Sequence, residues 1–285
     1  MTPRTLVVRA NGLEHRVIEW GDADAKRTVV LLHGFMDAPG TFGDVVPALV
    51  RVGFRVLAPH QRGFGQAPRV PEGAYYHFPD YVFDLAEVID ACVKDATFSL
   101  VGHSMGGTVA TLFAGAFPER IEKLVLLEGT GPLDNPAGVA PIRMRKWIED
   151  VRALRKKEQK PLRSREDALA RLSQNHGSVP VEVLRRRVDD LVGEGPNGEL
   201  AWLFDPLHRT LSPSPFFVAS YKEFAKRVSC PVLVVDGGPA GYQPPDEAER
   251  LACFAHVQRQ SLTAAGHMMH WTEPDAVARL LVEFL

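Results

Sequence analysis

Two kinds of apolar pattern alternate along the first 128 residues and return after residue 229. Thr28–Leu32 and Phe98–Val101 are short and almost wholly apolar, which is typical of strands buried on both faces of a parallel sheet. Tyr81–Val93 instead repeats its apolar residues at the spacing of one helical face. Together these patterns predict an α/β fold, with a mostly parallel central sheet, helices on both faces and right-handed crossovers.

The other predicted elements follow from the same two patterns and from one turn signal, Asn11-Gly12, which tolerates the positive φ of a tight hairpin. They are a hairpin of Thr5–Arg9 and Leu13–Glu19, strands at Phe54–Ala58, Ile121–Leu127, Cys230–Val235 and Val257–Leu262, and helices at Val45–Val52, Met105–Phe117 and Pro274–Leu285.

The alternation stops in the middle of the chain, where the sequence is charged, punctuated by proline and helix-like, without a clear buried strand. We therefore predict that residues 1–132 and 229–285 form the core and that residues 133–228 form an inserted helical lid. A basic stretch from Pro141 to Arg187 lies within this lid. It could steer an anionic substrate, but such charge runs more often form the solvated face of a helix.

Composition narrows the class of protein. A chain of 285 residues, 45% hydrophobic, can bury the core of one domain with an insertion. Its 33 basic and 35 acidic residues give no electrostatic case for binding nucleic acid or an anionic membrane. The three cysteines form no CxxC pair, no apolar run is long enough to span a membrane, and the first residues lack a signal-peptide pattern. We expect a cytoplasmic protein without a metal or a membrane span; the oligomeric state stays open.

The strongest chemical signal is the segment Gly102-His103-Ser104-Met105-Gly106-Gly107, which lies between a predicted strand and a predicted helix. In that context G-x-S-x-G indicates a sharp, strained turn that lifts the serine hydroxyl above the sheet at the start of a helix. Gly102 and Gly106 are needed because side chains there would collide across the turn. Ser104 is therefore the predicted nucleophile.

A serine hydroxyl needs a base beside it, and in folds of this kind the histidine follows the last strand. His267 has that place and comes directly after Gly266, which frees the loop to present it. His270 is the alternative, and we expect it to have a structural role.

The sequence identifies less clearly which carboxylate orients the base. Its usual place follows the seventh strand, but Ala240 stands where an aspartate would be expected. Glu128 ends an apolar strand, on the same sheet edge as Ser104, and keeps the chain order nucleophile–acid–base. We favour Glu128, with Asp236 and then Asp246 as alternatives.

Acyl transfer also needs two backbone N–H donors for the developing oxyanion. We expect them from Met105, which follows the nucleophile, and from Phe35, in the loop after an early strand. Trp147, Trp202 and Phe204 are candidates for an apolar substrate pocket, although aromatic residues of this kind more often form a core.

These residues give the chain a resemblance to the α/β-hydrolase fold family over nearly its whole length, closest to serine hydrolase-like proteins. The resemblance rests on His33-Gly34-Phe35, Gln61-Arg62-Gly63-Phe64-Gly65, Gly102–Gly107 and Gly266-His267, and on Tyr76-His77, Asp80-Tyr81-Val82 and Phe204-Asp205-Pro206. Some relatives, including haloalkane dehalogenases, carry their acid after the sixth strand, which supports Glu128. His60 and Ala240 depart from the family pattern, since both stand where relatives often have an acid.

The resemblance implies a reaction class, because relatives that cleave carbon–halogen bonds or epoxides have aspartate where Ser104 stands. A serine points to acyl transfer, and we predict hydrolysis of a small-molecule carboxylic ester without a cofactor. Three alternatives remain open: a carbon–carbon bond hydrolase, a non-catalytic ligand-binding protein of the same fold, and a partner-binding protein that uses the basic lid.

Overall fold

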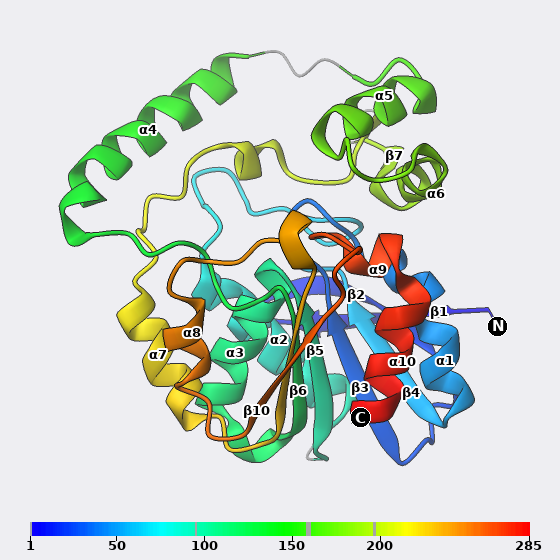
Figure 1. The fold of residues 1–285 in the computed structure, drawn as a ribbon. Coiled ribbons are helices and arrows are strands. Elements are labelled where there is room, and N and C mark those ends of the chain that lie inside the picture. The colour runs from blue at the N-terminus through cyan, green and yellow to red at the C-terminus, as the bar shows by residue number, and fades with distance from the viewer. Residues whose placement is uncertain (1, 95, 158–160, 196–197) are drawn as a thin grey trace.

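The computed structural model describes residues 2–94, 96–157, 161–195 and 198–285 and is built around an eight-stranded sheet (Figure 1). The strands of this sheet are β1 (Arg4–Ala10), β2 (Leu13–Trp20), β3 (Arg27–Leu32), β4 (Phe54–Pro59), β5 (Phe98–His103), β6 (Ile121–Leu127), β9 (Val232–Asp236) and β10 (Val257–Ser261). Their order is β1-β2-β4-β3-β5-β6-β9-β10. β1–β2 and β2–β4 pair antiparallel and the other neighbours pair parallel, so the predicted mostly parallel sheet is confirmed.

Helices cover both faces of the sheet, as predicted (Figure 1). They are α1 (Val46–Arg51), α2 (Phe78–Cys92), α3 (Met105–Ala116), α4 (Ala140–Lys156), α5 (Arg165–Asn175), α6 (Val181–Leu191), α7 (Val218–Arg227), α8 (Glu247–Leu251), α9 (Met269–Thr272) and α10 (Pro274–Phe284). None of the helices in the described residues is long and apolar enough to cross a membrane.

The two faces of the sheet have separate hydrophobic cores, and β3 shows why its sequence is apolar throughout. Val30 and Leu32 point into the core beneath α2 and α3, whereas Val29 and Leu31 point into the core beneath α1 and α10. Successive side chains of a strand face opposite ways, so a strand covered on both faces has no position for a polar residue. The carboxyl ends of β3, β5 and β6 therefore reach one edge of a rigid, fully packed layer.

The chain leaves the sheet between β6 and β9, which are neighbouring strands. The helices α4, α5 and α6 of this segment lie beyond the edge formed by the carboxyl ends of the parallel strands (Figure 1). This segment also contains a two-stranded hairpin, β7 (Val192–Glu194) and β8 (Leu200–Trp202). The sequence predicted no clear buried strand here, and five of the six residues in these two short strands are half-buried or exposed. Strands of three residues are too short to show an alternating pattern in the sequence.

α7 also differs from the prediction, which placed it in the lid. It packs against α3, where the hydroxyls of Tyr221 and Thr111 are 3.2 Å apart and almost fully buried. Arg227 Nε donates to the carbonyl oxygen of Gly115 at 2.8 Å. A Cβ on Gly115 would lie 2.4 Å from Phe224 O, so a glycine is needed for α7 to come this close to α3. The part of the chain that lies above the sheet edge thus ends before Val218 instead of at residue 228.

Candidate active site

Ser104 occupies a strained turn between β5 and α3, as the sequence predicted. Its backbone has φ 51° and ψ −116°, a conformation that residues other than glycine rarely adopt. A Cβ on Gly102 would lie 2.4 Å from Gly106 O, and a Cβ on Gly106 would lie 2.3 Å from Leu32 O. Both positions must be glycine for the turn to close, and the result is a half-buried serine at the start of α3 that lines a cavity.

His267 and Glu128 form a hydrogen-bonded chain with this serine. His267 Nε2 lies 3.1 Å from Ser104 Oγ, and His267 Nδ1 lies 2.6 Å from Glu128 Oε2. The Glu128 side chain is fully buried, whereas that of His267 is about one-third exposed. A carboxylate at Nδ1 fixes the proton on that nitrogen and leaves Nε2 as the acceptor for the serine proton.

The Glu128 carboxylate lies in a site made by glycines. It accepts hydrogen bonds from the backbone N–H groups of Gly237 and Tyr242, both at 2.6 Å, in addition to the bond with His267. A Cβ on Gly241 would lie 1.8 Å from Glu128 Oε1, so only glycine leaves room for the carboxylate. Sequence reasoning missed Gly237 and Gly241. The signal was present, because three glycines surround the position where an acid was expected after the seventh strand.

The two alternative acids have other partners. Asp236 Oδ1 accepts from Ser261 Oγ at 2.7 Å, and its Oδ2 accepts from Arg259 Nε at 3.1 Å. Asp246 accepts from Arg250 Nε at 3.0 Å. The structure therefore brings Glu128, and neither of these aspartates, to His267.

The backbone N–H groups of Phe35 and Met105 have no acceptor within the part of the chain that the structure describes. Both residues line the same cavity as Ser104. Gly34 allows the loop after β3 to approach the serine turn, because a Cβ there would lie 2.6 Å from His103 Nδ1. The two N–H groups are thus available as donors beside the serine.

The ring of His33 fixes the start of this loop. Its Nε2 accepts the N–H of Gln61 at 3.2 Å, and its Nδ1 lies 2.8 Å from Gly34 O, an arrangement that suits a neutral ring with its proton on Nδ1. Burial lowers the pKa of His33, which favours this neutral form.

A cavity of about 470 Å³ opens beside Ser104, a volume suited to a small organic ligand. Aromatic and uncharged side chains dominate its lining, and none of the described lining residues is a lysine or an arginine. Burial lowers the pKa of one of its histidines, His208, to about 4, so this ring is neutral at pH 7. The lining residues are Phe35, Tyr75, Tyr76, His77, Phe78, Tyr81, Ser104, Met105, Thr108, Glu128, Gly131, Pro132, His208, Thr210, Leu211, Ser212, Tyr242 and His267.

The predicted pocket residues Trp147, Trp202 and Phe204 are not among them, which corrects that prediction. Trp147 lies behind the cavity wall, with its ring 5.5 Å from that of Tyr75. Trp202 and Phe204 stack on each other with their rings 6.2 Å apart. The wall includes instead the segment that leads into α2 and the turn around Thr210.

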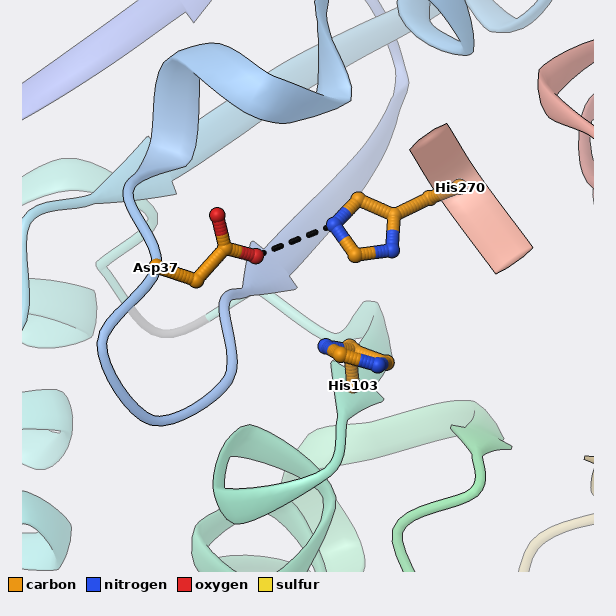
Figure 2. A group of neighbouring side chains, drawn as sticks. All are labelled: Asp37, His103 and His270. Carbon is orange, nitrogen blue, oxygen red and sulfur yellow. Dashed lines mark hydrogen bonds and ion pairs between the residues drawn. The ribbon is translucent and has the colours of Figure 1, made fainter. Parts of the chain in front are cut away.

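His270, the alternative base, lies away from Ser104 in a second polar cluster with Asp37 and His103 (Figure 2). Ligand atoms of these three buried side chains lie within 4.8 Å of one another, the geometry of a potential metal site. However, His270 Nε2 already lies 3.0 Å from Asp37 Oδ2, and His103 Nε2 lies 2.8 Å from His267 O. The other ring nitrogens, Nδ1 of His103 and Nδ1 of His270, have no hydrogen-bond partner among the described residues.

His60 leads to a prediction about pH and stability. Burial, with smaller effects from His33 and Arg16, lowers the pKa of His60 to about 3. Below its ordinary pKa of about 6.5, the unfolded chain binds a proton that the folded protein does not, so stability falls as the pH drops from about 6.5 toward 3. For this one group the loss at pH 5 is about 2 kcal/mol.

We expect His60→Gln to lose about 2 kcal/mol less stability than the wild type between pH 7 and pH 5. Urea unfolding of both proteins at both pH values measures this difference. Because each protein is compared with itself, any cost of the substitution at pH 7 cancels. An equal pH dependence in the two proteins would show that folding does not lower the pKa of His60.

The geometry defines a class: a serine on a strand-to-helix turn, with a histidine and a carboxylate at the carboxyl edge of a parallel sheet, is the arrangement of α/β hydrolases. Residues 27–274 match the family model described as alpha/beta hydrolase fold. The chain belongs to this family.

Three relatives illustrate the range of activities. A serine hydrolase-like protein of Danio rerio is 40% identical over 131 residues, which cover 46% of this chain and only 39% of that protein. The sn-1-specific diacylglycerol lipase ABHD11 of Mus musculus is 29% identical over 93% of this chain and 82% of its own length. A 2-hydroxy-6-oxononadienedioate/2-hydroxy-6-oxononatrienedioate hydrolase of Cupriavidus pinatubonensis is 27% identical over 100% of this chain and 95% of its own length.

Proposed function

We propose that this protein is a serine hydrolase that cleaves a carboxylic ester bond through Ser104, His267 and Glu128. The observation that carries the proposal is the hydrogen-bonded chain from Ser104 Oγ through His267 to Glu128, at the wall of the 470 Å³ cavity. Such a chain turns a weakly nucleophilic hydroxyl into a reactive one.

The proposed reaction has two halves. As Ser104 Oγ bonds to the ester carbonyl carbon, its proton moves to His267 Nε2, and the N–H groups of Phe35 and Met105 bind the oxyanion. The intermediate then breaks its bond to the alcohol oxygen, which takes the proton from His267, and leaves an acyl group on Ser104. Water, deprotonated by His267, releases the acid and restores the serine. Glu128 stabilises the imidazolium in both halves.

An ester is favoured over a carbon–carbon bond by the character of the cavity. The Cupriavidus relative is named for dienedioate substrates, which carry two carboxylates. Among the described residues, the lining of the cavity contains no lysine or arginine, and His208 is neutral at pH 7, so these residues would give an anionic substrate no cationic partner for its buried charge. The diacylglycerol of the mouse relative is an uncharged ester. Carbon–carbon hydrolysis is the second candidate.

The segment above the sheet edge would act as a lid that sets the size of the acyl group. Thr210 and Leu211 line the cavity, and the hydroxyl of Thr210 lies 2.7 Å from that of Tyr75, which also lines it. This contact joins the inserted segment to the core beside the substrate space. We retain residues 1–132 and 229–285 as the proposed core, with α7 added to it.

A comparison of substrates tests this function. We expect turnover of neutral p-nitrophenyl esters, with kcat/KM falling once the acyl chain outgrows the cavity. A matched ester with a terminal carboxylate should have a kcat/KM at least about tenfold lower, because its charge is desolvated without a partner. Equal rates for the two esters, or a preference for a vinylogous diketone, would favour the carbon–carbon hydrolase.

A further inference from the structure

A buried polar cluster behind Ser104 connects the segments that carry the proposed reacting groups. In Figure 2, the carboxylate of Asp37 faces the ring of His270, and the ring of His103 lies beside this pair. Asp37 belongs to the loop that holds Phe35, and His270 follows His267 at the start of α9. Asp37 Oδ2 and His270 Nε2 are 3.0 Å apart, and the two side chains are 1% and 0% exposed. The loop of an oxyanion donor is thus bound directly to the segment of the base.

His103 adds the nucleophile turn to this connection. It directly precedes Ser104, and its Nε2 lies 2.8 Å from the backbone oxygen of His267. Its ring centroid is 4.5 Å from that of His270. The backbones around Phe35, Ser104 and His267 therefore share one set of buried contacts.

Both carboxylate oxygens of Asp37 are hydrogen-bonded, whereas Nδ1 of His270 has no hydrogen-bond partner among the described residues. Asp37 Oδ1 accepts the N–H of Ala38 at 2.8 Å, and the Thr41 hydroxyl lies 3.3 Å from His270 Nε2. Burial alone would raise the pKa of Asp37, but the hydrogen bond and charge of His270 outweigh it and hold this pKa below its ordinary value. Both oxygens of a buried carboxylate are thus engaged, and removal of either partner leaves an unsatisfied polar group.

We propose that Asp37 and His270 form a positioning pair that holds the N–H of Phe35 where it can bind the oxyanion. The pair acts through the backbone of the loop and touches no substrate. Oxyanion stabilisation depends on donors within a few tenths of an ångström of their correct place. Release of the loop from His270 would therefore weaken binding of the transition state more than it weakens binding of the substrate. This inference rests on the proposed serine hydrolase function.

The test uses Asp37→Asn, His270→Ala and the double variant, with His270→Gln as the conservative replacement that can still donate to Asp37. For each single variant we expect kcat for a p-nitrophenyl ester to fall about 10- to 100-fold with little change in KM. The double variant should be no worse than the poorer single, because the residues act as one unit. His270→Gln should recover part of the loss.

A second measurement separates positioning from simple destabilisation. Affinity for a boronic acid, which forms a tetrahedral adduct with the serine, should weaken by the same factor as kcat/KM, while affinity for the product acid should not change. Tyr221→Phe is the matched control. It removes the buried contact with Thr111 behind α3, and we expect it to lower the unfolding temperature but leave kcat unchanged.

Three results would overturn the inference. If the Asp37 and His270 variants unfold at a lower temperature but have the same kcat as Tyr221→Phe, the role of the pair is purely structural. Wild-type activity that a chelator removes and Zn²⁺ restores would make the cluster a metal site instead. A wild type that neither hydrolyses the ester nor reacts with a fluorophosphonate would refute the proposed function and this inference together, which distinguishes that failure from the first two.

Discussion

Replacement of Ser104 with alanine is expected to abolish turnover, with kcat for a p-nitrophenyl ester lowered by about 10⁴- to 10⁶-fold. The reason is that Ser104 Oγ, 3.1 Å from His267 Nε2, is the nucleophile of the proposed mechanism. What would remain is the slow attack of water on an ester held by the oxyanion donors. Wild type and variant, measured side by side with the same ester, give the factor.

Two controls make this result specific to the hydroxyl at position 104. Ser99→Ala removes another serine hydroxyl from β5, buried upstream of the turn, and should leave kcat unchanged. A fluorophosphonate should label wild type and Ser99→Ala but not Ser104→Ala. If Ser104→Ala kept its activity, the mechanism would be wrong. If the wild type itself showed neither turnover nor labelling, the fold would be serving as a ligand-binding protein.

Much of the fold could be predicted because the sheet is covered on both faces. Val29, Val30, Leu31 and Leu32 belong alternately to two cores, so the strand had to be apolar at every position. The same constraint marks β5 and β6, and with helices between them only a parallel arrangement with right-handed crossovers remained. Here the local pattern and the tertiary structure carry the same information.

The inserted segment was harder to predict, because an amphipathic helix does not specify what its apolar face covers. α7 has the periodicity of any lid helix, yet Tyr221 and Ala225 pack into the core beneath α3. The small strands β7 and β8 have no pattern of their own and exist because they pair with each other. In both cases the partner surface, which is distant in sequence, decides the outcome.

The same distinction applies to the site. Ser104 and His267 were predictable because turn geometry and chain order restrict where they can lie, and the structure brings them together. The cavity wall was not predictable from the sequence, because Tyr75 and Thr210 are far apart in sequence and meet only when the inserted segment folds over the core. Trp147 looked equally suitable, but it packs behind Tyr75.

Glu128→Gln is expected to lower kcat by about 10²- to 10⁴-fold. The carboxylate accepts hydrogen bonds from His267 Nδ1 and from the N–H groups of Gly237 and Tyr242. A glutamine has one acceptor oxygen, and its NH₂ group facing Nδ1 would favour the tautomer that has its proton on Nε2. His267 could then no longer accept the proton of Ser104. Asp236→Asn is the matched control and should cost little.

Gly241→Ala offers an independent route to the same conclusion, because it leaves every proposed reacting group in the chain. Its Cβ would lie 1.8 Å from Glu128 Oε1, so the carboxylate must move away from His267, and kcat should fall with the serine and the base intact. Thermal unfolding of each variant checks that the fold survives. Loss of activity in Asp236→Asn, with Glu128→Gln and Gly241→Ala close to wild type, would assign the acid to Asp236. The reverse pattern would mean that this chain orients its base from the end of β6, with glycines where the more usual acid would stand.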